Sequence, residues 1–462
     1  MHHLSRRRLL QWGSALSLTW LGLDRRLAGA EPWNAPRLPA LVPDPKGLLD
    51  LPPGFRYVVV SKAGARMTDG LTTPGAMDGM AAFAGPAGSI LLVRNHELTP
   101  GNVGEGPFGP DLAGFAALAP ASVYDRGGNR QPSQGGTTTV VLDGATGTLR
   151  HEFLSLAGTN RNCAGGPTPW GSWISCEEDL TTVGTNDRGW QADRRHGYAF
   201  EVPARAEPGL AEPIPLRAMG RFNREAVAID PRSGIVYQTE DARDGVFTRF
   251  VPHKPGELRA GGKLQALRML EYPNPVTSNW GAAPFPVGAT HACSWVDIAN
   301  PDDNPAAQAR AQGAQAFTRG EGCWFGSDAV WFACTDGGPA RKGQIWRYVP
   351  GATSDDGGSL TLFVEPNDGA VLENVDNITV TPWGALFACE DNSSKDASPE
   401  NRMVHVRPDG LAEVFAVNRL NSGELAGACF SPDGKWCFVN IMYPGLTLAI
   451  TGPWATLAPT PS

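Results

Sequence analysis

One short pattern recurs six times along the chain and restricts the folds that it can adopt. Each copy has a turn containing Gly, four or five apolar residues, and then polar or acidic residues. The copies are PAGSILLVRNHE (86–97), PWGSWISCEED (169–179), SGIVYQTEDARDG (233–245), SDAVWFACTDGG (327–338), PWGALFACEDN (382–392) and PDGKWCFVNI (432–441). They start about 50 to 95 residues apart, and a four-stranded blade with its turns needs about 40–45 residues. The pattern therefore predicts an all-β chain folded as a six-bladed β-propeller with irregular insertions between blades, in which the N- and C-terminal strands share a blade.

The composition agrees with this fold and limits the function. The 462 residues include 56 Gly and 40 Pro, and only 19% are charged, which favours many short strands joined by tight turns. The net charge is −8, and no basic stripe is present. We therefore expect no nucleic-acid partner, and an acidic surface suits a protein that holds cations of its own. We also expect a monomer.

The N-terminal segment SRRRLLQWGSALSLTWLGLDRRLAGA resembles an export signal. A charged start, a modest apolar stretch and a small-residue end at Ala28-Gly29-Ala30 are typical of a cleaved secretory signal. The arginine run points to the twin-arginine export machinery. The sequence thus predicts a signal over residues 1–30, a single propeller domain over 31–462 and a periplasmic or secreted protein without a stable membrane span. A retained basic amphipathic anchor is the alternative.

Carboxylates follow the apolar strand in most copies of the repeat. In a propeller, strand ends from all blades meet at the mouth of the central channel, so these acids are expected to gather there: Glu97, Glu177, Glu178, Glu240, Asp241, Asp336, Glu390 and Asp391. So many carboxylates would repel one another unless cations neutralised them. Hard oxygen ligands in number favour calcium or a trivalent metal. Alternatively, each acid caps a turn or faces solvent.

The eight cysteines fall into different groups. Three of them, Cys176, Cys334 and Cys389, occupy the same place in three repeats, where a small buried hydrophobe is expected. Two others, Cys429 and Cys437, flank a turn and are either free thiols or a disulfide. Cys163 differs, because it lies in the Gly-rich stretch TNRNCAGGPTPWG shortly before two repeat acids. A thiolate beside carboxylates would be a soft ligand for a transition metal such as iron; a buried structural thiol is the alternative.

Two further stretches carry possible chemistry. In AFTRGEGCWFG, Arg319 and Glu321 are two residues apart and face the same side of a strand. An arginine beside a metal-bound carboxylate could bind phosphate with paired hydrogen bonds, although an Arg–Glu surface pair is the simpler interpretation. Asp376 in LENVDNITV precedes a strand and either shapes a turn or binds a hard cation. Glu225 and Glu240 are expected at the same end of one hairpin.

Six segments together resemble the PhoX-type alkaline phosphatase family, over residues 51 to 454. They are TNRNCAGGPTPWGSWISCEE, HGYAFEV, NREAVAIDP with YQTEDARDGVFTRFVP, FTRGEGCWF, NVDNITVTPWG and SGELAGACFSPDGKWCFVNIMYPGLTLAITGPW. The resemblance implies a β-propeller exported by the twin-arginine route. It also implies hydrolysis of small phosphomonoesters at a site that combines ferric iron (Fe3+), calcium (Ca2+) and a bridging oxo group.

The resemblance also implies roles for particular residues. Cys163 and Glu225 correspond to ligands on the iron side, and Arg319 corresponds to the contact with substrate phosphate. Further iron or calcium ligands would be Glu178, Glu321 and Asp376, and the candidates by position only are Glu97, Glu177, Glu240 and Glu390. Three positions depart from the family's motifs: Arg224 and Tyr443 stand where His is usual, and Gly320 stands where Pro often precedes the Glu.

Two other functions are compatible with the same residues. A calcium-dependent propeller lactonase or phosphotriesterase would use the axial carboxylates without iron. A non-catalytic propeller would bind a protein or peptide, and the acids would hold structural calcium only. Neither function needs Cys163, so replacement of this cysteine discriminates them from the phosphatase.

Overall fold

The computed structural model describes residues 35–272, 276–281, 285–353, 355–392 and 400–459. The export signal expected over residues 1–30 lies outside this part of the chain. Among the described residues, no helix has both the length and the apolar character needed to cross a membrane.

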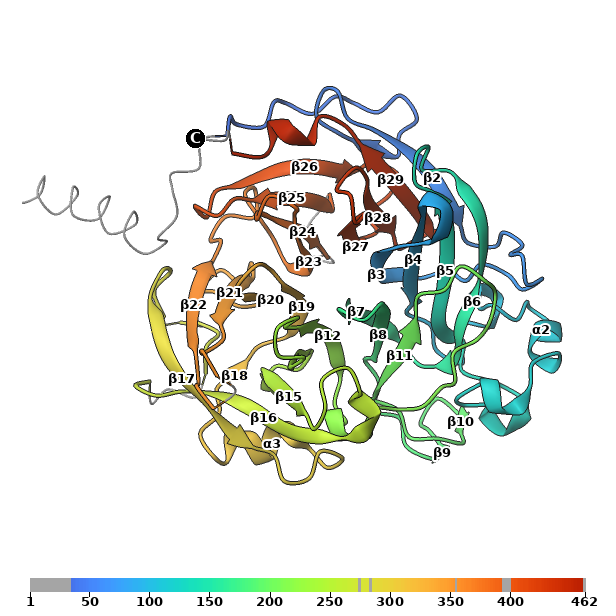
Figure 1. The fold of residues 1–462 in the computed structure, drawn as a ribbon, viewed down its shortest axis with the longest axis horizontal. Coiled ribbons are helices and arrows are strands. Elements are labelled where there is room, and N and C mark those ends of the chain that lie inside the picture. The colour runs from blue at the N-terminus through green and yellow to red at the C-terminus, as the bar shows by residue number, and fades with distance from the viewer. Residues whose placement is uncertain (1–34, 273–275, 282–284, 354, 393–399, 460–462) are drawn as a thin grey trace, which may run out of the picture.

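The strands form six blades around a central axis (Figure 1). The innermost strands of neighbouring blades contact one another all the way round, in the order β3, β7, β12, β19, β23, β27 and back to β3. In four blades the chain adds each further strand outwards and antiparallel to the last; the fifth and sixth blades each receive their outermost strand from the N-terminal part of the chain. The predicted six-bladed propeller is therefore confirmed.

The blades have the following strands. The first contains β3 (Met77–Ala84), β4 (Ser89–His96), β5 (Gly135–Asp143) and β6 (Leu149–Thr159); the second contains β7 (Asn162–Pro167), β8 (Ser172–Glu177) and β11 (Ala199–Pro203). The third contains β12 (Arg224–Ile229), β13 (Val236–Glu240), β15 (Thr248–Pro252) and β16 (Gly262–Met269); the fourth contains β19 (Gly320–Phe325), β20 (Val330–Cys334), β21 (Gln344–Val349) and β22 (Ser359–Val364). The fifth contains β23 (Val375–Val380), β24 (Leu386–Glu390), β25 (Arg402–Val406), β26 (Ala412–Asn418) and β1 (Leu49–Asp50); the sixth contains β27 (Leu425–Phe430), β28 (Cys437–Ile441), β29 (Leu446–Thr451) and β2 (Arg56–Lys62).

The remaining elements are short or connect blades. Strand β17 (Thr290–Asp297) pairs with both β16 and β22 and so joins the third and fourth blades into one sheet. The other strands are β9 (Gly184–Thr185), β10 (Gln191–Ala192), β14 (Gly245–Val246) and β18 (Ala316–Phe317). The helices are α2 (Ala113–Ala116) and α3 (Pro305–Arg310), and the 3-10 turns are η1 (Pro86–Gly88), η2 (Val103–Glu105), η3 (Pro120–Ser122), η4 (Gly127–Asn129), η5 (Arg217–Met219), η6 (Leu258–Ala260) and η7 (Trp454–Thr456).

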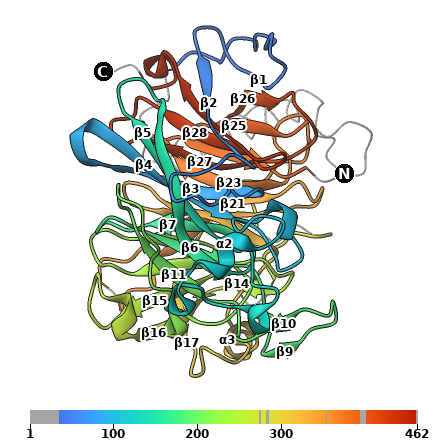
Figure 2. The same cartoon turned by 90° about the vertical axis from the view of Figure 1, so that its right-hand side faces the viewer.

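The ring is closed by strands from the two ends of the chain, as the sequence predicted. Strand β2 pairs antiparallel with β29 and becomes the outermost strand of the sixth blade. Figure 2 shows the blue strands β1 and β2 beside the red C-terminal strands. Closure therefore depends on a contact between residues almost 400 positions apart, such as Arg56 with Thr451.

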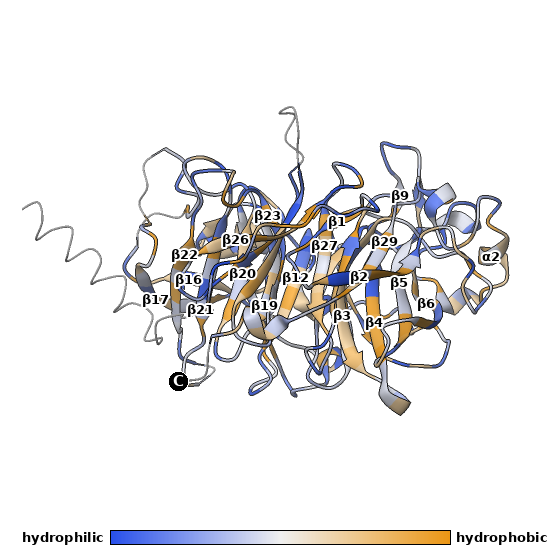
Figure 3. Cartoon of the chain, turned by 90° about the horizontal axis from the view of Figure 1, so that it is seen from above, coloured by the Kyte–Doolittle hydropathy of each residue, from blue (hydrophilic) through white to orange (hydrophobic). Residues whose placement is uncertain are grey.

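The six sequence repeats are the second strands of the six blades: β4, β8, β13, β20, β24 and β28. Their apolar residues are buried between neighbouring sheets, as with Ile174 and Phe332, which are 0% exposed. Hydrophobic colour follows the strands in Figure 3, and hydrophilic colour gathers in the loops at both faces. This arrangement explains why each apolar run ends abruptly in polar residues.

Small residues allow the inner strands to approach the axis closely. A Cβ atom on Gly79 would lie 2.5 Å from the Cα of Ala164, and one on Gly322 would lie 2.6 Å from the backbone oxygen of Asp376. Both neighbours belong to the next blade, so a side chain at either glycine would push two blades apart. These glycines therefore allow the inner strands of neighbouring blades to pack closely around the axis.

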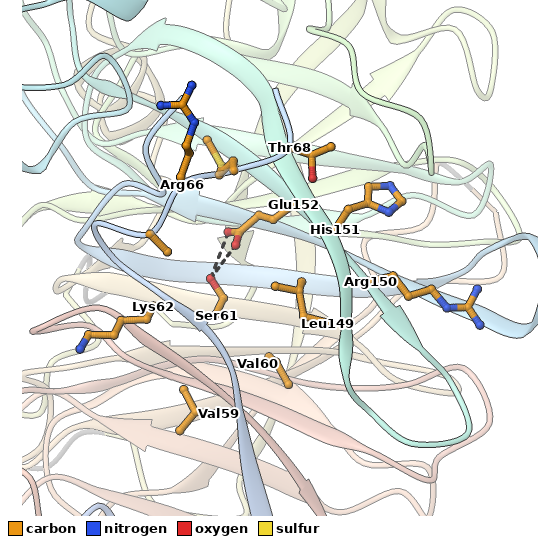
Figure 4. Close-up of a pocket in the computed structure, with 12 residues that line it drawn as sticks. Val59, Val60, Ser61, Lys62, Arg66, Thr68, Leu149, Arg150, His151 and Glu152 are labelled. Atoms are coloured by element: carbon orange, nitrogen blue, oxygen red, sulfur yellow. Dashed lines mark hydrogen bonds between the residues drawn. The ribbon is translucent and has the colours of Figure 1, made fainter. Parts of the chain in front are cut away.

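A shallow pocket of about 290 Å³ lies between the outermost strands β2 and β6 of neighbouring blades (Figure 4). Its floor includes Glu152, whose carboxylate accepts a hydrogen bond from Ser61 Oγ at 3.0 Å and binds the buried Arg94 at 2.6 Å. None of the candidate site residues named from the sequence lines this pocket.

Candidate metal centre

Each inner strand has a β-bulge close to its first residue. In every blade two residues of the inner strand lie opposite a single residue of the second strand. They are the two residues between Arg224 and Val227 in β12, for example, or between Gly320 and Cys323 in β19. A bulge leaves one residue unpaired and redirects its side chain. In five blades the first bulged residue is acidic or cysteine: Asp78, Cys163, Glu225, Glu321 and Asp376.

A second set of acids comes from the loops next to these bulges. Glu97, Glu178 and Asp391 directly follow the second strands β4, β8 and β24, and Glu424 directly precedes β27. With the bulge residues they form four overlapping groups whose ligand atoms lie within 4.8 Å of one another: Asp78–Glu97–Cys163, Cys163–Glu178–Glu225, Glu225–Glu321–Asp376 and Asp376–Asp391–Glu424. The groups share members and so form one continuous cluster with contributions from all six blades.

Burial and mutual repulsion raise the pKa values of several carboxyl groups in the cluster. Burial, followed by repulsion from neighbouring carboxylates, raises the pKa values of Asp78, Glu225 and Glu321 well above the usual range. Burial also raises the pKa of Glu178 to about 8 and that of Asp376 to about 7, with neighbouring carboxylates adding to the rise. Because each group is buried among like charges, all of them can be ionised together only if positive charge lies between them. The donors therefore fit bound metal ions.

The chemistry of the donors differs along the cluster. Cys163 is 5% exposed, and its Sγ lies 3.1 Å from Oε2 of Glu178. A thiolate combined with carboxylates suits a transition metal such as iron. At the other end, Asp376, Asp391 and Glu424 offer only carboxylate oxygens, which suit a hard cation such as calcium.

Arg319 lies at the edge of this cluster. Its Nε and Nη2 donate to the two carboxylate oxygens of Asp241 at 2.9 and 3.1 Å, and Nη2 lies 2.9 Å from Glu321 Oε1. The side chain is 40% exposed. The expected proximity of Arg319 and Glu321 is thus present, and the guanidinium combines a fixed position with access to solvent.

Five acids that we expected near the axis lie outside the four groups. Asp241 pairs with Arg319, and Asp336 accepts a hydrogen bond from Thr318 Oγ1 at 2.6 Å. The other three are the last residues of their strands. Glu177 accepts hydrogen bonds from His196 Nδ1 at 2.6 Å and from the backbone N–H of Gly197 at 2.9 Å. Glu390 forms a two-point ion pair with Arg402 at 2.6 and 2.7 Å, and Glu240 accepts from the backbone N–H of Val246 at 3.2 Å. The reason is alternation: these are the last residues of their strands, so their side chains lie on the opposite side from those of the residues that follow.

The structure adds two cluster members, Asp78 and Glu424, that we did not select from the sequence. Asp391, which was expected to converge with the other acids but was not named as a ligand, belongs to the cluster as well. A signal for Asp78 was present, since MDGM, NCAGG, REAV and GEGC all place a ligand type before a small residue at the start of a strand. No comparable signal marks Glu424, which lies before its strand.

The remaining residues singled out in the sequence have structural partners. All eight cysteines are buried free thiols, so Cys429 and Cys437 form no disulfide in this structure. Arg224, at one of the positions that differ from the family motif, is fully buried and donates to the backbone oxygens of Met219 and Gly220 at 2.9 and 2.7 Å. Arg224 therefore supports the backbone of the loop that leads into the third blade.

The fold and the site together define a class: a β-propeller whose axis holds a buried cluster of cation-binding side chains. Comparison with protein families shows which family within this class the chain belongs to: the model of the family described as alkaline phosphatase PhoX matches residues 37–445. The chain belongs to this family and is a phosphatase. The resemblance stated from the sequence motifs is thus confirmed.

Solved structures show similarity of fold. A PhoX from Pseudomonas fluorescens, in complex with vanadate as a transition state analogue, is 18% identical, with 92% of this chain and 98% of that chain covered and a TM-score of 0.67. The gluconolactonase XC5397 from Xanthomonas campestris is 12% identical, with 87% of this chain and 99% of that chain covered and a TM-score of only 0.34. No curated protein matches the sequence significantly.

Proposed function

We propose that the protein hydrolyses phosphomonoesters at a centre of ferric iron and calcium on the propeller axis. The observation that carries this proposal is the combination of one thiol with buried carboxylates, bordered by an exposed arginine. Cys163, Glu178 and Glu225 form the mixed thiol and carboxylate group, and Arg319 supplies the positive charge at its edge.

The donors divide between the two kinds of metal by their chemistry. In this proposal Cys163, Glu178 and Glu225 would hold iron. Calcium would be held by the oxygen donors of the remaining groups, which are Glu321, Asp376, Asp391, Glu424, Asp78 and Glu97. When bound, such cations act as Lewis acids toward phosphate oxygens and lower the pKa of water, which makes a nucleophile available at neutral or alkaline pH.

The protein itself would contribute orientation and charge. Arg319 is held by both oxygens of Asp241, so its guanidinium is oriented before substrate arrives. In this orientation it can donate to the phosphoryl oxygens and stabilise the charge that develops during transfer. The Pseudomonas fluorescens PhoX binds vanadate as a transition state analogue, which supports this assignment to phosphoryl transfer.

The cellular context is part of the same proposal. We propose that residues 1–30 direct export by the twin-arginine machinery and that residues 31–462 act as a single monomeric domain in the periplasm or outside the cell. Export after folding would allow the buried cluster to collect iron in the cytoplasm. The net charge of the chain is −8, which by itself would repel a small anionic substrate. Bound cations and arginines would have to offset this negative charge at the site.

Metal analysis combined with an activity assay tests the proposal. The purified exported protein is analysed for iron and calcium, and phosphate release from 4-nitrophenyl phosphate is measured with and without added calcium. Iron together with calcium-dependent phosphate release is expected. Calcium without iron, and no phosphate release, would reject the proposal in favour of a lactonase or phosphotriesterase, or of a non-catalytic calcium-binding propeller.

A further inference from the structure

Arg161 occupies the same place in the second blade that Arg319 occupies in the fourth. Each arginine directly precedes the first residue of an inner strand, β7 or β19. Their backbone hydrogen bonds also correspond. The N–H groups of Arg161 and Arg319 donate to a loop of the preceding blade, at Leu98 and Ala242, both at 2.9 Å.

The two guanidinium groups have corresponding ion pairs. Arg161 donates from Nε and Nη2 to Glu97 Oε1 at 3.0 and 2.7 Å, and from Nη2 to Glu178 Oε2 at 2.6 Å. Glu97 follows the second strand of the preceding blade, as Asp241 does for Arg319. Glu178 belongs to the same blade as Arg161, as Glu321 does for Arg319. Both arginines are therefore held by one carboxylate from each of two adjacent blades.

Each guanidinium keeps donors for a ligand. Within the described part of the chain, Nη1 of Arg161 and Nη1 of Arg319 make no hydrogen bond or ion pair, because the carboxylates use only Nε and Nη2. The side chains are 37% and 40% exposed. Both guanidiniums thus have a fixed position, a free edge and access from solvent.

The backbone at these positions is strained. Arg161 has φ 44° and Arg319 has φ 47°, in the left-handed region that costs a residue other than glycine about 1–2 kcal/mol. Ala76 and Asn374 share this geometry before β3 and β23, so the bend belongs to the repeat. Arginine, in contrast, is found at this bend in two blades only, and both carry it at the metal cluster.

The two arginines border the same run of carboxylates. Arg161 contacts Glu178 and Arg319 contacts Glu321, and Glu225 lies within 4.8 Å of both acids through the shared groups. A phosphoryl group that reached the metals over Glu225 would therefore have a guanidinium on either side.

We propose that Arg161 is a second guanidinium that contacts the phosphoryl group, and that the pair selects dianionic monoesters over diesters. This inference rests on the proposed function. A monoester presents three non-bridging oxygens and nearly two negative charges, so it can accept hydrogen bonds from both arginines and still contact cations. A diester has only two such oxygens and one charge, so the second arginine gains little.

Variants of Arg161 test the inference. Metal content, kinetics with 4-nitrophenyl phosphate and bis(4-nitrophenyl) phosphate, and inhibition by vanadate are compared for Arg161→Gln, Arg161→Lys and Arg319→Gln. The control is Arg150→Gln, which removes an arginine of similar exposure, 36%, paired with Asp143 at the turn between β5 and β6.

We expect Arg161→Gln to lower kcat/KM for the monoester by about 100-fold, to weaken vanadate inhibition at least tenfold, and to change diester turnover far less. Lysine should restore only part of the effect, because it lacks the planar fork.

The metal content of the variants shows whether Arg161 contacts the substrate directly or instead supports the metal-binding carboxylates. If Arg161→Gln loses iron or calcium in parallel with activity, Arg161 acts through Glu97 and Glu178 and the inference is overturned. Unchanged vanadate inhibition at full metal content overturns it as well. If the metal-loaded wild type releases no phosphate, the proposed function fails. Calorimetry of vanadate binding then decides the role of Arg161: weaker binding by the Gln variant supports it, and equal binding rejects it.

Discussion

The environment of Cys163 separates it from the other buried thiols of the chain. Cys389 is buried within a strand of the fifth blade, among the apolar side chains of Phe387 and Met403. Cys163 instead lies in a bulge with its sulfur beside Glu178, where burial and neighbouring carboxylates raise the pKa of the thiol well above its usual value. A bound cation would stabilise the thiolate at this position.

Replacement of Cys163 by Ser is therefore expected to remove iron and activity together. The oxygen of serine is a poor substitute for a soft thiolate ligand, whereas the carboxylate-only groups keep their donors, so calcium should remain. The matched control Cys389→Ser should retain both metals. Elemental analysis and phosphate release measure the result. Full iron content in Cys163→Ser would remove this residue from the ligand set.

His405 provides a test of pH dependence away from the metal centre. It is 2% exposed, and its Nε2 accepts a hydrogen bond from Trp383 Nε1 at 3.2 Å. Burial, and then the charge of Arg407, lowers its pKa from 6.5 to about 4. Because the pKa in the folded state is below the unfolded value, the neutral ring contributes stability that is present above pH 6.5 and lost as the pH falls through about 4.

The difference corresponds to about 3 kcal/mol at most. We expect the free energy of unfolding of the wild type to fall between pH 6.5 and 4 by more than that of His405→Gln, which cannot take up the proton. Urea unfolding of both proteins across this range measures the difference. Parallel curves would show that His405 has no altered pKa.

At the scale of the element, the bulge and the glycines next to it form one structural unit. The bulge turns the ligand toward the axis, and in four blades a Gly or Ala follows the ligand and makes room for the next blade. In the sixth blade the equivalent bulge residue is Gly427, and a Cβ atom there would lie 2.4 Å from the backbone oxygen of Asp78. The sixth blade therefore supplies its carboxylate, Glu424, from outside the strand.

Gly322→Ala tests this unit. Its Cβ would lie 2.6 Å from both the oxygen of Asp376 and the nitrogen of Ile378, and backbone atoms cannot move aside cheaply. We expect a loss of about 2 kcal/mol or more in the free energy of unfolding and weaker calcium binding, because Asp376 would shift. Gly209→Ala, where no atom lies within 4 Å of the new Cβ, should change stability by less than about 0.5 kcal/mol. Equal effects of the two changes would contradict close packing at the axis.

At the scale of the whole molecule, we expect closure of the ring by β2 to contribute strongly to the free energy of unfolding. Val60 on β2 is 5% exposed and packs with Phe438 and Ala449 of the sixth blade, whereas its neighbour Val59 is 45% exposed. Val60→Asp would bury an unpaired charge between the closing strand and the ring and should cost about 3 kcal/mol or more. Val59→Asp keeps its charge in water and should cost far less. Urea unfolding distinguishes the two variants, and similar losses would mean that β2 contributes little to closure.

The metal cluster should also stabilise the whole ring, because its donors come from all six blades. Calcium at a hundredfold its Kd would add about 2.7 kcal/mol for each site, and it would offset the repulsion between the buried carboxylates. We expect EGTA to lower the Tm and added calcium to restore it, as followed by calorimetry. An unchanged Tm in excess EGTA would argue against calcium as a bridge between blades.

The sequence by itself determined the repeat, and with it the number of blades, the closure by the two chain ends, and the family. The repeat and the family motifs are local features, since a turn, an apolar run and a polar end each occupy consecutive residues. Closure by the two chain ends was expected only because such repeats form a ring. The sequence motifs also singled out Cys163, Glu225, Glu321 and Asp376 as candidates, and the structure brings these four residues into one cluster at the starts of inner strands.

Only the tertiary structure decided which acids face the axis. Glu177 and Glu178 are neighbours in sequence, yet one accepts hydrogen bonds from His196 and Gly197 and the other joins the cluster. The difference of one residue reverses the direction of a strand side chain, and the register that sets it depends on bulges at contacts between distant segments. The same long-range geometry brought Asp78, Glu424 and Arg161 to the site, because the axis exists only once all six blades have closed around it.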